Sequence, residues 1–434
     1  MKVHILGICG TFMAGVAKLM IEKGYEVSGS DKDFYPPMSE YLETLKIDLI
    51  KGYDSQNLPE ADLYVIGNVI SRGNESFEKI LSNKLPYTSG PKIIADLTKE
   101  ENLIAVTGTH GKTTTSYMLC HIFIENGIDI GYLVGGISPH FQDSAKIGTA
   151  NIFIIEGDEY DSALFDKRSK FINYNPHSII INNIEFDHAD IFRDIDDIKR
   201  QFHHLVKIIP NDGSIMYHHD DPNIKDVINL GSWSKMLPIG EEDLFYSYEN
   251  REMTFNKINY SLTALPLKGI HNFKNYVAAI YMAYQYGVPI KKSIQALSNF
   301  SGVKRRQELV YDKNNISIID DFAHHPTAIK LTIESIKHEN PKKNIIGIIE
   351  LGSNTMASGK HIDLLINAAN DLDSIYWYDP RHALKDKLFK KTFNSLDDLH
   401  KDLLAKIQTD SIILIMTNKN SSHIYQPIRE YLEG

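Results

Sequence analysis

The segment AVTGTHGKTTT, which ends at Thr115, limits the possible folds of this chain more than any other segment. It follows an apolar run at residues 103–106 and leads into a run with helical spacing. A glycine-rich turn between a strand and a helix, followed by a lysine and hydroxyl residues, is typical of proteins that hold the phosphates of a nucleotide. One position is irregular, because Val106 stands where the common phosphate loop has its first glycine, and the extra glycine is Gly108. The segment predicts an α/β domain with a phosphate loop.

Each residue type in this loop has a chemical reason to be there. Backbone N–H groups at the start of the helix face the anion, Lys112 supplies a mobile positive charge, and Thr113 can ligate a magnesium ion. A structural turn with a surface lysine is the alternative. We expect the phosphates of a nucleotide and Mg²⁺ as the ligands, held by Gly108, Thr109, His110, Gly111, Lys112, Thr113 and Thr114.

Two further segments place acids or a histidine directly after a predicted strand. Glu156 follows the apolar run at residues 152–155, where phosphate-loop proteins place a second acid that helps to hold magnesium. Its neighbour Asp158 is expected to be a solvated loop acid. His188 lies beside Asp187 in NNIEFDHAD, after a strand at residues 178–181, and can ligate a metal or hold a phosphate oxygen. A plain surface histidine is the alternative for His188.

The segment KGIHNFKNYVAAI places His271, Asn272 and Asn275 at the start of a predicted helix. The amide of Asn275 offers one donor and one acceptor, which match the edge of an adenine. Asn272 is expected to cap the helix. Further along, Asp321 follows a strand and can accept hydrogen bonds from ribose hydroxyls, while an arginine such as Arg306 offsets phosphate charge.

The N-terminus predicts a second nucleotide-binding unit. Residues 3–6 read as a strand, residues 7–10 as a tight turn and residues 11–23 as a helix that Gly24 ends. A second strand closes at Asp31, which gives half of a dinucleotide fingerprint. A pyrophosphate at the Gly10 helix start is the favoured interpretation, and a redox cofactor is the alternative.

Size and composition suit an enzyme of several domains. At about 150 residues per domain, 434 residues suggest three domains, which we place at residues 1–99, 100–301 and 302–434. The net charge of −10 argues against nucleic-acid binding, and the apolar runs are too short to span a membrane. Cys9 and Cys120 lie in apolar segments, as expected of buried thiols in a reducing compartment such as the cytoplasm. Nothing in the sequence indicates the oligomeric state.

Several segments together resemble the Mur ligase superfamily, over residues 1 to about 335: GICGTFM, YPPMSEYLE, GTHGKTTT, EGDEYDSALFDKRSKF, NNIEFDHADIF, QFHHLVKIIP, HN-x-x-N and DDFAHHPTAI. FDKRSKF and FDHADIF point to the murein peptide ligases within it. The resemblance implies three α/β domains: a Rossmann-like domain for the UDP-sugar, a central P-loop ATP-binding domain and a Rossmann-like C-terminal ligase domain. It also implies a reaction, in which the tripeptide L-alanyl-γ-D-glutamyl-meso-diaminopimelate is joined to UDP-N-acetylmuramate through an acyl phosphate during peptidoglycan recycling.

The resemblance also implies roles for individual residues. Lys112 contacts the ATP phosphates, Thr113 and Glu156 hold one magnesium ion, and His188 helps to position a second. His271 and Asn275 receive the adenine, and Arg306 and Asp321 complete the nucleotide site. The residues expected to act in catalysis are Lys112, Glu156, His188 and Arg306. The sugar nucleotide is expected at Gly7, Cys9, Gly10, Thr11, Phe12, Met13, Asp31 and Ser71.

Two segments of the third domain depart from the family pattern. Gly352 replaces the arginine of EPRSNTM, and TNKNSSH from Thr417 replaces a glycine-rich run. Both changes fall where the incoming amine should bind, and they keep two alternatives open. One is an L-alanine ligase of the MurC type, and the other is a nucleotide-binding protein that has lost ligation. An oxidoreductase is the least favoured interpretation, because the N-terminal fingerprint is incomplete.

Overall fold

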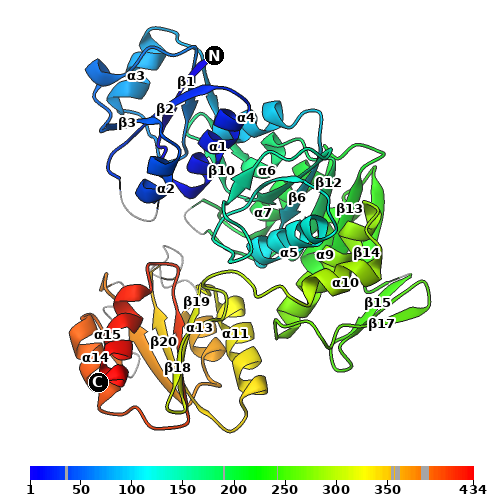
Figure 1. The fold of residues 1–434 in the computed structure, drawn as a ribbon, viewed down its shortest axis with the longest axis vertical. Helices are drawn as coiled ribbons and strands as arrows, with labels where there is room; N and C mark the ends of the chain where they lie inside the picture. The colour runs from blue at the N-terminus through cyan, green and yellow to red at the C-terminus, as the bar shows by residue number, and fades with distance from the viewer. Residues whose placement is uncertain (35–37, 189–190, 242, 353–355, 357–361, 383–390) are drawn as a thin grey trace. The chain divides into compact units, whose positions relative to one another are not determined.

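A computed structural model describes residues 1–34, 38–188, 191–241, 243–352, 356, 362–382 and 391–434. The chain forms two compact units (Figure 1). The first contains Met1–Glu185, Asp194–Pro266 and Lys274–Ser301, and the second contains Phe186–Arg193, Leu267–Phe273 and Gly302–Gly434. Among the described residues, no helix is long and apolar enough to cross a membrane.

The first unit begins with a parallel five-stranded sheet in the order β3-β2-β1-β4-β5, drawn in blue in Figure 1. Its strands are β1 (Lys2–Leu6), β2 (Glu26–Asp31), β3 (Asp48–Lys51), β4 (Leu63–Ile66) and β5 (Tyr87–Ser89). Its helices are α1 (Thr11–Glu22), α2 (Met38–Thr44), α3 (Glu75–Ser82) and α4 (Gly90–Leu97). The strands and the helix predicted before Asp31 are confirmed.

A second sheet of the first unit carries the phosphate-loop segment. It has seven strands in the order β14-β13-β12-β6-β9-β7-β8. These strands are β6 (Asn102–Thr107), β7 (Gly131–Leu133), β8 (Ala145–Lys146), β9 (Ile152–Gly157), β12 (Ser178–Ile181), β13 (Ser214–His218) and β14 (Lys235–Ile239). The helices around it are α5 (Lys112–Glu125), α7 (Ile195–Val206), α8 (Pro222–Asn229), α9 (Ile270–Gln285) and α10 (Ile290–Leu297).

Smaller elements complete the first unit. A hairpin of β10 (Asp161–Ala163) and β11 (Asp166–Ser169) leads into the short helix α6 (Lys170–Asn173). The antiparallel strands β15 (Leu244–Ser247), β16 (Glu252–Phe255) and β17 (Ile258–Ser261) form a third sheet. The sequence between residues 213 and 268 predicts short strands and no helix. The strands are confirmed, but helix α8 was missed. Asp221 begins that helix, because its side chain accepts hydrogen bonds from the N–H groups of Asn223 and Ile224.

The second unit holds a six-stranded sheet in the order β18-β19-β23-β20-β21-β22. The strands are β18 (Glu308–Lys313), β19 (Ile316–Asp321), β20 (Asn344–Glu350), β21 (Ser374–Tyr378), β22 (Thr392–Phe393) and β23 (Ser411–Met416). Only β18 pairs antiparallel among these strands. In the sequence, apolar runs at residues 316–319, 345–349, 374–378 and 412–416, with helical patterns between them, predict four strands of a doubly wound domain. They correspond to β19, β20, β21 and β23, so this prediction is confirmed.

Alternate residues of these strands enter two separate cores, as the pleat requires when both faces of a sheet are covered. On β20, Ile345 and Ile349 pack with α11 (Pro326–Glu339) and α13 (Ile362–Ala368). Ile346 and Ile348 pack on the opposite side with α14 (Leu396–Leu404) and α15 (Ser422–Glu433). The sheet therefore has helices on both faces, which is the doubly wound arrangement expected from the sequence.

Candidate active site

The glycine-rich turn links β6 to α5, as predicted. Gly108 has φ +126° and Gly111, which caps α5, has φ +81°. These backbone conformations strain any residue with a side chain. Space is also limiting, because a Cβ atom at Gly111 would lie 2.7 Å from Oδ1 of Asn275. The loop therefore needs both glycines, and Asn275 packs directly against it.

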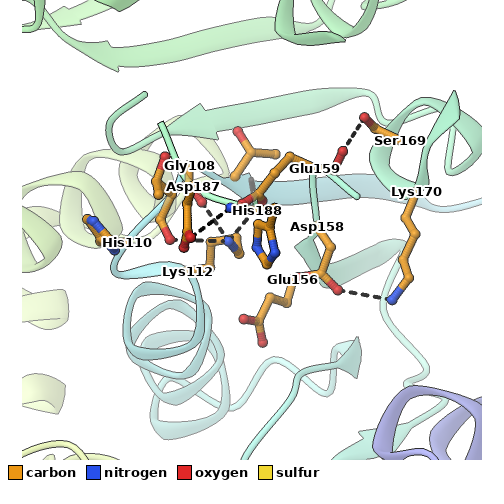
Figure 2. A network of polar contacts seen from close by, with 12 residues as sticks. Gly108, His110, Lys112, Glu156, Asp158, Glu159, Ser169, Lys170, Asp187 and His188 are labelled. Carbon is orange, nitrogen blue, oxygen red and sulfur yellow. Dashed lines mark hydrogen bonds and ion pairs between the residues drawn. The ribbon is translucent and has the colours of Figure 1, made fainter. Parts of the chain in front are cut away.

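Lys112 lies in the first turn of α5 and is buried, with 9% of its surface exposed. Its Nζ donates to the Gly108 carbonyl at 2.7 Å and to Oε2 of Glu159 at 3.0 Å (Figure 2). Burial opposes the charged form, but Glu159 and the other acids nearby outweigh it and raise the pKa of Lys112 above its ordinary value. The ammonium group is thus fixed at the mouth of the loop and stays charged.

Thr113 and Glu156 are brought together as predicted. The Thr113 hydroxyl donates to Oε1 of Glu156 at 2.8 Å, and the Gly135 N–H donates to Oε2 at 2.9 Å. Figure 2 shows Glu156 beside the loop, where β9 ends. A hydroxyl and a carboxylate are both hard oxygen donors, which suit Mg²⁺. This pair therefore fits the ion that the sequence predicts.

The prediction for Asp158 is wrong, because this carboxylate is not a solvated loop acid. Its side chain is 17% exposed, and Oδ2 lies 3.2 Å from Nζ of Lys170. Burial opposes ionisation, but Lys170 and Lys112 outweigh it and hold the pKa of Asp158 below its ordinary value. Its lysine partner, twelve positions further along the chain, is brought there by the hairpin and α6.

Two asparagines that directly follow β12 support the loop, and neither was predicted from the sequence. Oδ1 of Asn183 accepts a hydrogen bond from the His110 N–H at 2.8 Å. The Asn182 amide donates to the Thr115 hydroxyl at 3.1 Å, while its buried Oδ1 has no partner. The doublet at the start of NNIEFDHAD, directly after a predicted strand, is the signal that could have indicated this support. An adjacent acid, Glu185, lies 3.7 Å from Nε2 of His110.

The first sheet gathers the residues predicted for the sugar nucleotide. The Cys9 N–H donates to Oδ2 of Asp31 at 2.7 Å, which fixes the turn after β1. Asp31 and Ser71 line one cleft of about 350 Å³, together with Tyr53, Arg72 and neighbouring residues. Gly7 has φ +81° in the turn, Gly10 and Thr11 are exposed, Phe12 is half-buried, and Cys9 and Met13 are buried.

His188, His271, Arg306 and Asp321 belong to the second unit, whereas Lys112, Thr113, Glu156 and Asn275 belong to the first. That the two groups share one site therefore stays a prediction. Within the second unit, the His188 N–H donates to the Asp187 carboxylate at 2.7 Å. Burial opposes ionisation of Asp187, but His188 and two further histidines outweigh it and hold its pKa at about 2.

The remaining predicted residues of the second unit lie around the end of β19. Arg306 places its guanidinium carbon 4.9 Å from the ring centre of Phe322. Asp321 is buried, and its Oδ2 accepts the Gln307 N–H at 2.8 Å. Burial raises its pKa, and Arg306 opposes that rise. Asp321 therefore fixes the backbone next to Arg306, and its contact with a ribose stays a prediction.

Other expectations concern the helix start and the departures from the family pattern. Helix α9 begins at Ile270, so Asn272 does not cap it; its amide donates to the Lys268 carbonyl at 2.8 Å. The Arg381 guanidinium donates to the Gly352 carbonyl at 2.5 Å, so one cation of this region does reach the glycine. Residues 353–355, which follow it, lie outside the described residues.

Comparison with known protein families accounts for most of the chain. Three family models match. The model named 'Mur ligase family, catalytic domain' matches residues 2–102, 'Mur ligase middle domain' matches residues 106–283, and 'Mur ligase, glutamate ligase domain' matches residues 305–418. The chain belongs to the Mur ligase family. The predicted family and three-part α/β architecture are thereby confirmed. The exact domain limits and the roles of single residues stay predictions.

Two relatives and one solved structure resemble this Mur ligase over its full length. The UDP-N-acetylmuramate–L-alanyl-γ-D-glutamyl-meso-2,6-diaminoheptandioate ligases of Haemophilus influenzae and Escherichia coli are each 39% identical to it. The alignments cover 99% of this chain and 99% of the first relative, and 100% and 98% for the second. A murein peptide ligase from Psychrobacter arcticus is 36% identical, with a TM-score of 0.77 over 100% of this chain and 98% of that one.

Proposed function

We propose that this Mur ligase joins L-alanyl-γ-D-glutamyl-meso-diaminopimelate to UDP-N-acetylmuramate at the expense of ATP. The observation that carries the proposal is the 39% identity, over nearly the whole of both chains, to two ligases named for this reaction. The phosphate loop supports it, because Lys112, Thr113 and Glu156 stand together as a phosphate-transfer site needs.

The first step transfers a phosphoryl group between two anions. The carboxylate of the sugar acid attacks the γ-phosphorus of ATP, the bond to the β-phosphate oxygen breaks, and an acyl phosphate and ADP result. Repulsion between the anions opposes this approach. Backbone N–H groups at the start of α5 and the charged Lys112 offset it, because they are already oriented before the substrates meet.

Thr113 and Glu156 would hold a magnesium ion, which supplies positive charge to the phosphate oxygens when it is bound. The Thr113 hydroxyl donates to Oε1 of Glu156 at 2.8 Å, so both oxygen donors are directed at one place. Glu156 is further fixed by the Gly135 N–H. These two hydrogen bonds therefore hold the donor pair together.

The second step forms the amide bond. The free amine of the peptide attacks the acyl carbon, phosphate leaves, and the amine loses a proton to solvent or a nearby base. An acyl phosphate hydrolyses readily, so water must be excluded while the amine arrives. We assign the sugar nucleotide to the cleft with Asp31 and Ser71, and the adenine to Asn275, which packs on the loop.

A product assay tests this proposal. The protein is incubated with UDP-N-acetylmuramate, ATP and magnesium, with either the tripeptide or L-alanine, and ADP and product mass are measured. We expect conjugate with the tripeptide. The replacement of the family arginine by Gly352 makes L-alanine the second candidate, and conjugate with alanine alone would favour it. ADP release without any conjugate would show that ligation has been lost.

A further inference from the structure

Lys170 is a buried lysine that the loop chemistry does not explain. Its side chain is 6% exposed, whereas that of Lys167, in the same FDKRSKF run, is 69% exposed. The Lys170 ammonium lies 3.2 Å from Oδ2 of Asp158, 4.2 Å from the ring centre of Tyr160 and 4.5 Å from that of Phe12. A buried ammonium is costly unless it is paired, and here one carboxylate and two aromatic faces surround it.

These contacts join two regions that bind different substrates under the proposed function. Phe12 lies in the first turn of α1 and is one of the residues expected to bind the sugar nucleotide. Asp158 and Tyr160 belong to the acidic run that holds Lys112 through Glu159. Lys170 therefore touches the sugar-nucleotide region on one side and the phosphate-loop region on the other.

The backbone around Lys170 is also fixed to the acidic run. The Ser169 hydroxyl donates to the Glu159 carbonyl, and the Lys170 N–H donates to the Tyr160 carbonyl at 3.0 Å. Figure 2 shows Lys170 reaching Asp158 while Ser169 reaches the backbone at Glu159. Because these bonds hold the start of α6 in place, the lysine side chain has a defined direction toward Phe12.

We propose that Lys170 is a positioning residue, which fixes the Phe12 turn against the acidic run so that the sugar carboxylate meets the γ-phosphate of ATP in line. The inference rests on the proposed function, and it concerns only the first of the two steps. The rate depends strongly on how the carboxylate and the γ-phosphate are placed, because a misplacement of about 1 Å can lower it about 100-fold. A single contact between the two regions can therefore control the rate without controlling affinity.

The test measures ADP formation in a single turnover with ATP, magnesium and UDP-N-acetylmuramate, without any amine. Lys170→Met is combined with Asp158→Asn, so that no buried carboxylate loses its partner. We expect the rate to fall about 100-fold, while the dissociation constants of ATP and of the sugar nucleotide change less than about 3-fold. Lys170→Arg should recover most of the rate, because a guanidinium also binds aromatic faces. Lys167→Met is the matched control and should leave the rate unchanged.

A double-mutant cycle with Phe12→Leu tests whether the two residues act together, and a general loss of stability does not change its result. If Lys170 acts through Phe12, removing both should slow ADP formation no more than removing Lys170 alone. Additive losses, an unchanged rate, or a rise in the sugar-nucleotide dissociation constant with the rate intact would each overturn the inference. Failure of the proposed function looks different: the unmodified protein would then form ADP but yield no conjugate with the tripeptide.

Discussion

At the scale of single residues, Lys112 and Glu159 form a buried pair whose members depend on each other. Lys112→Met removes the charge at the phosphate loop and leaves Glu159, which is 2% exposed, without its cation. Breaking a buried pair in this way costs about 3–5 kcal/mol of folding free energy. The double variant Lys112→Met with Glu159→Gln should recover most of that loss, because no buried charge remains.

Both variants should lose ligation, whereas binding of UDP-N-acetylmuramate should change less than about 2-fold, since its cleft lies on the other sheet. Urea unfolding measures the folding free energy, a product assay measures ligation, and calorimetric titration measures binding of the sugar nucleotide. Lys99→Met, at an exposed lysine, is the control. Ligation by the double variant at more than about one tenth of the normal rate would contradict a role of the ammonium in phosphate transfer.

Residue types in the loop could be predicted from the sequence, but their partners could not all be predicted. Thr113 and Glu156 were expected together, because Glu156 stands at the end of a strand where phosphate-loop proteins place a second acid, and β9 does run parallel to β6. Asp158 was misjudged, since its exposure depends on Lys170, which a hairpin brings back to it. Local pattern shows where a side chain begins, whereas tertiary packing decides what it meets.

At the scale of elements, the turn between β6 and α5 works only with glycine. Gly111→Ala should destabilise the protein by more than about 1 kcal/mol and lower ligation, because the left-handed backbone is strained and the new methyl group meets Asn275 at 2.7 Å. Gly127→Ala separates the two causes. Gly127 has φ +76°, but nothing lies within 4 Å of an added Cβ.

Thermal unfolding and the product assay are measured for both variants, with Gly127→Ala as the matched control. Gly127→Ala should cost only the backbone strain and leave ligation unchanged. Equal effects of the two substitutions on ligation would contradict the close approach of Asn275 to the loop. The turn itself was predictable from its glycines, whereas its support by Asn183 was not, because Asn183 follows a strand far along the chain.

At the scale of the whole molecule, two buried histidines link folding to pH. Burial lowers the pKa of His4 to about 4 and that of His218 to about 3. Both rings are neutral in the folded protein, but they take up protons in the unfolded chain below pH about 6.5. The unfolded state then binds more protons, so the free energy of unfolding falls as the pH drops from about 6.5 toward 4.

Each histidine contributes up to about 1.4 kcal/mol per pH unit to this slope. His4→Gln should make the slope shallower by the contribution of one proton, as urea unfolding at several pH values would show. His338→Gln, at an exposed histidine, should leave the slope unchanged. A His4→Gln protein with the full slope would mean that His4 is already protonated when folded.

The layered α/β arrangement was predictable because apolar runs alternate with helical patterns, and the strands of the last sheet were found in this way. Helix α8 was missed between short strands, although Asp221 and Pro222 were signs of a helix start. Contacts such as that between Phe12 and Lys170 lay beyond prediction, since no local pattern connects residues so far apart.

Helix α5 has one consequence for how the enzyme moves. All its residues from Lys112 to Phe123 are buried, so it is an interior helix rather than a surface one. Amide hydrogens in such a position exchange only when a large part of the structure opens. A nucleotide can therefore bind and dissociate many times without local unfolding of the helix that receives it.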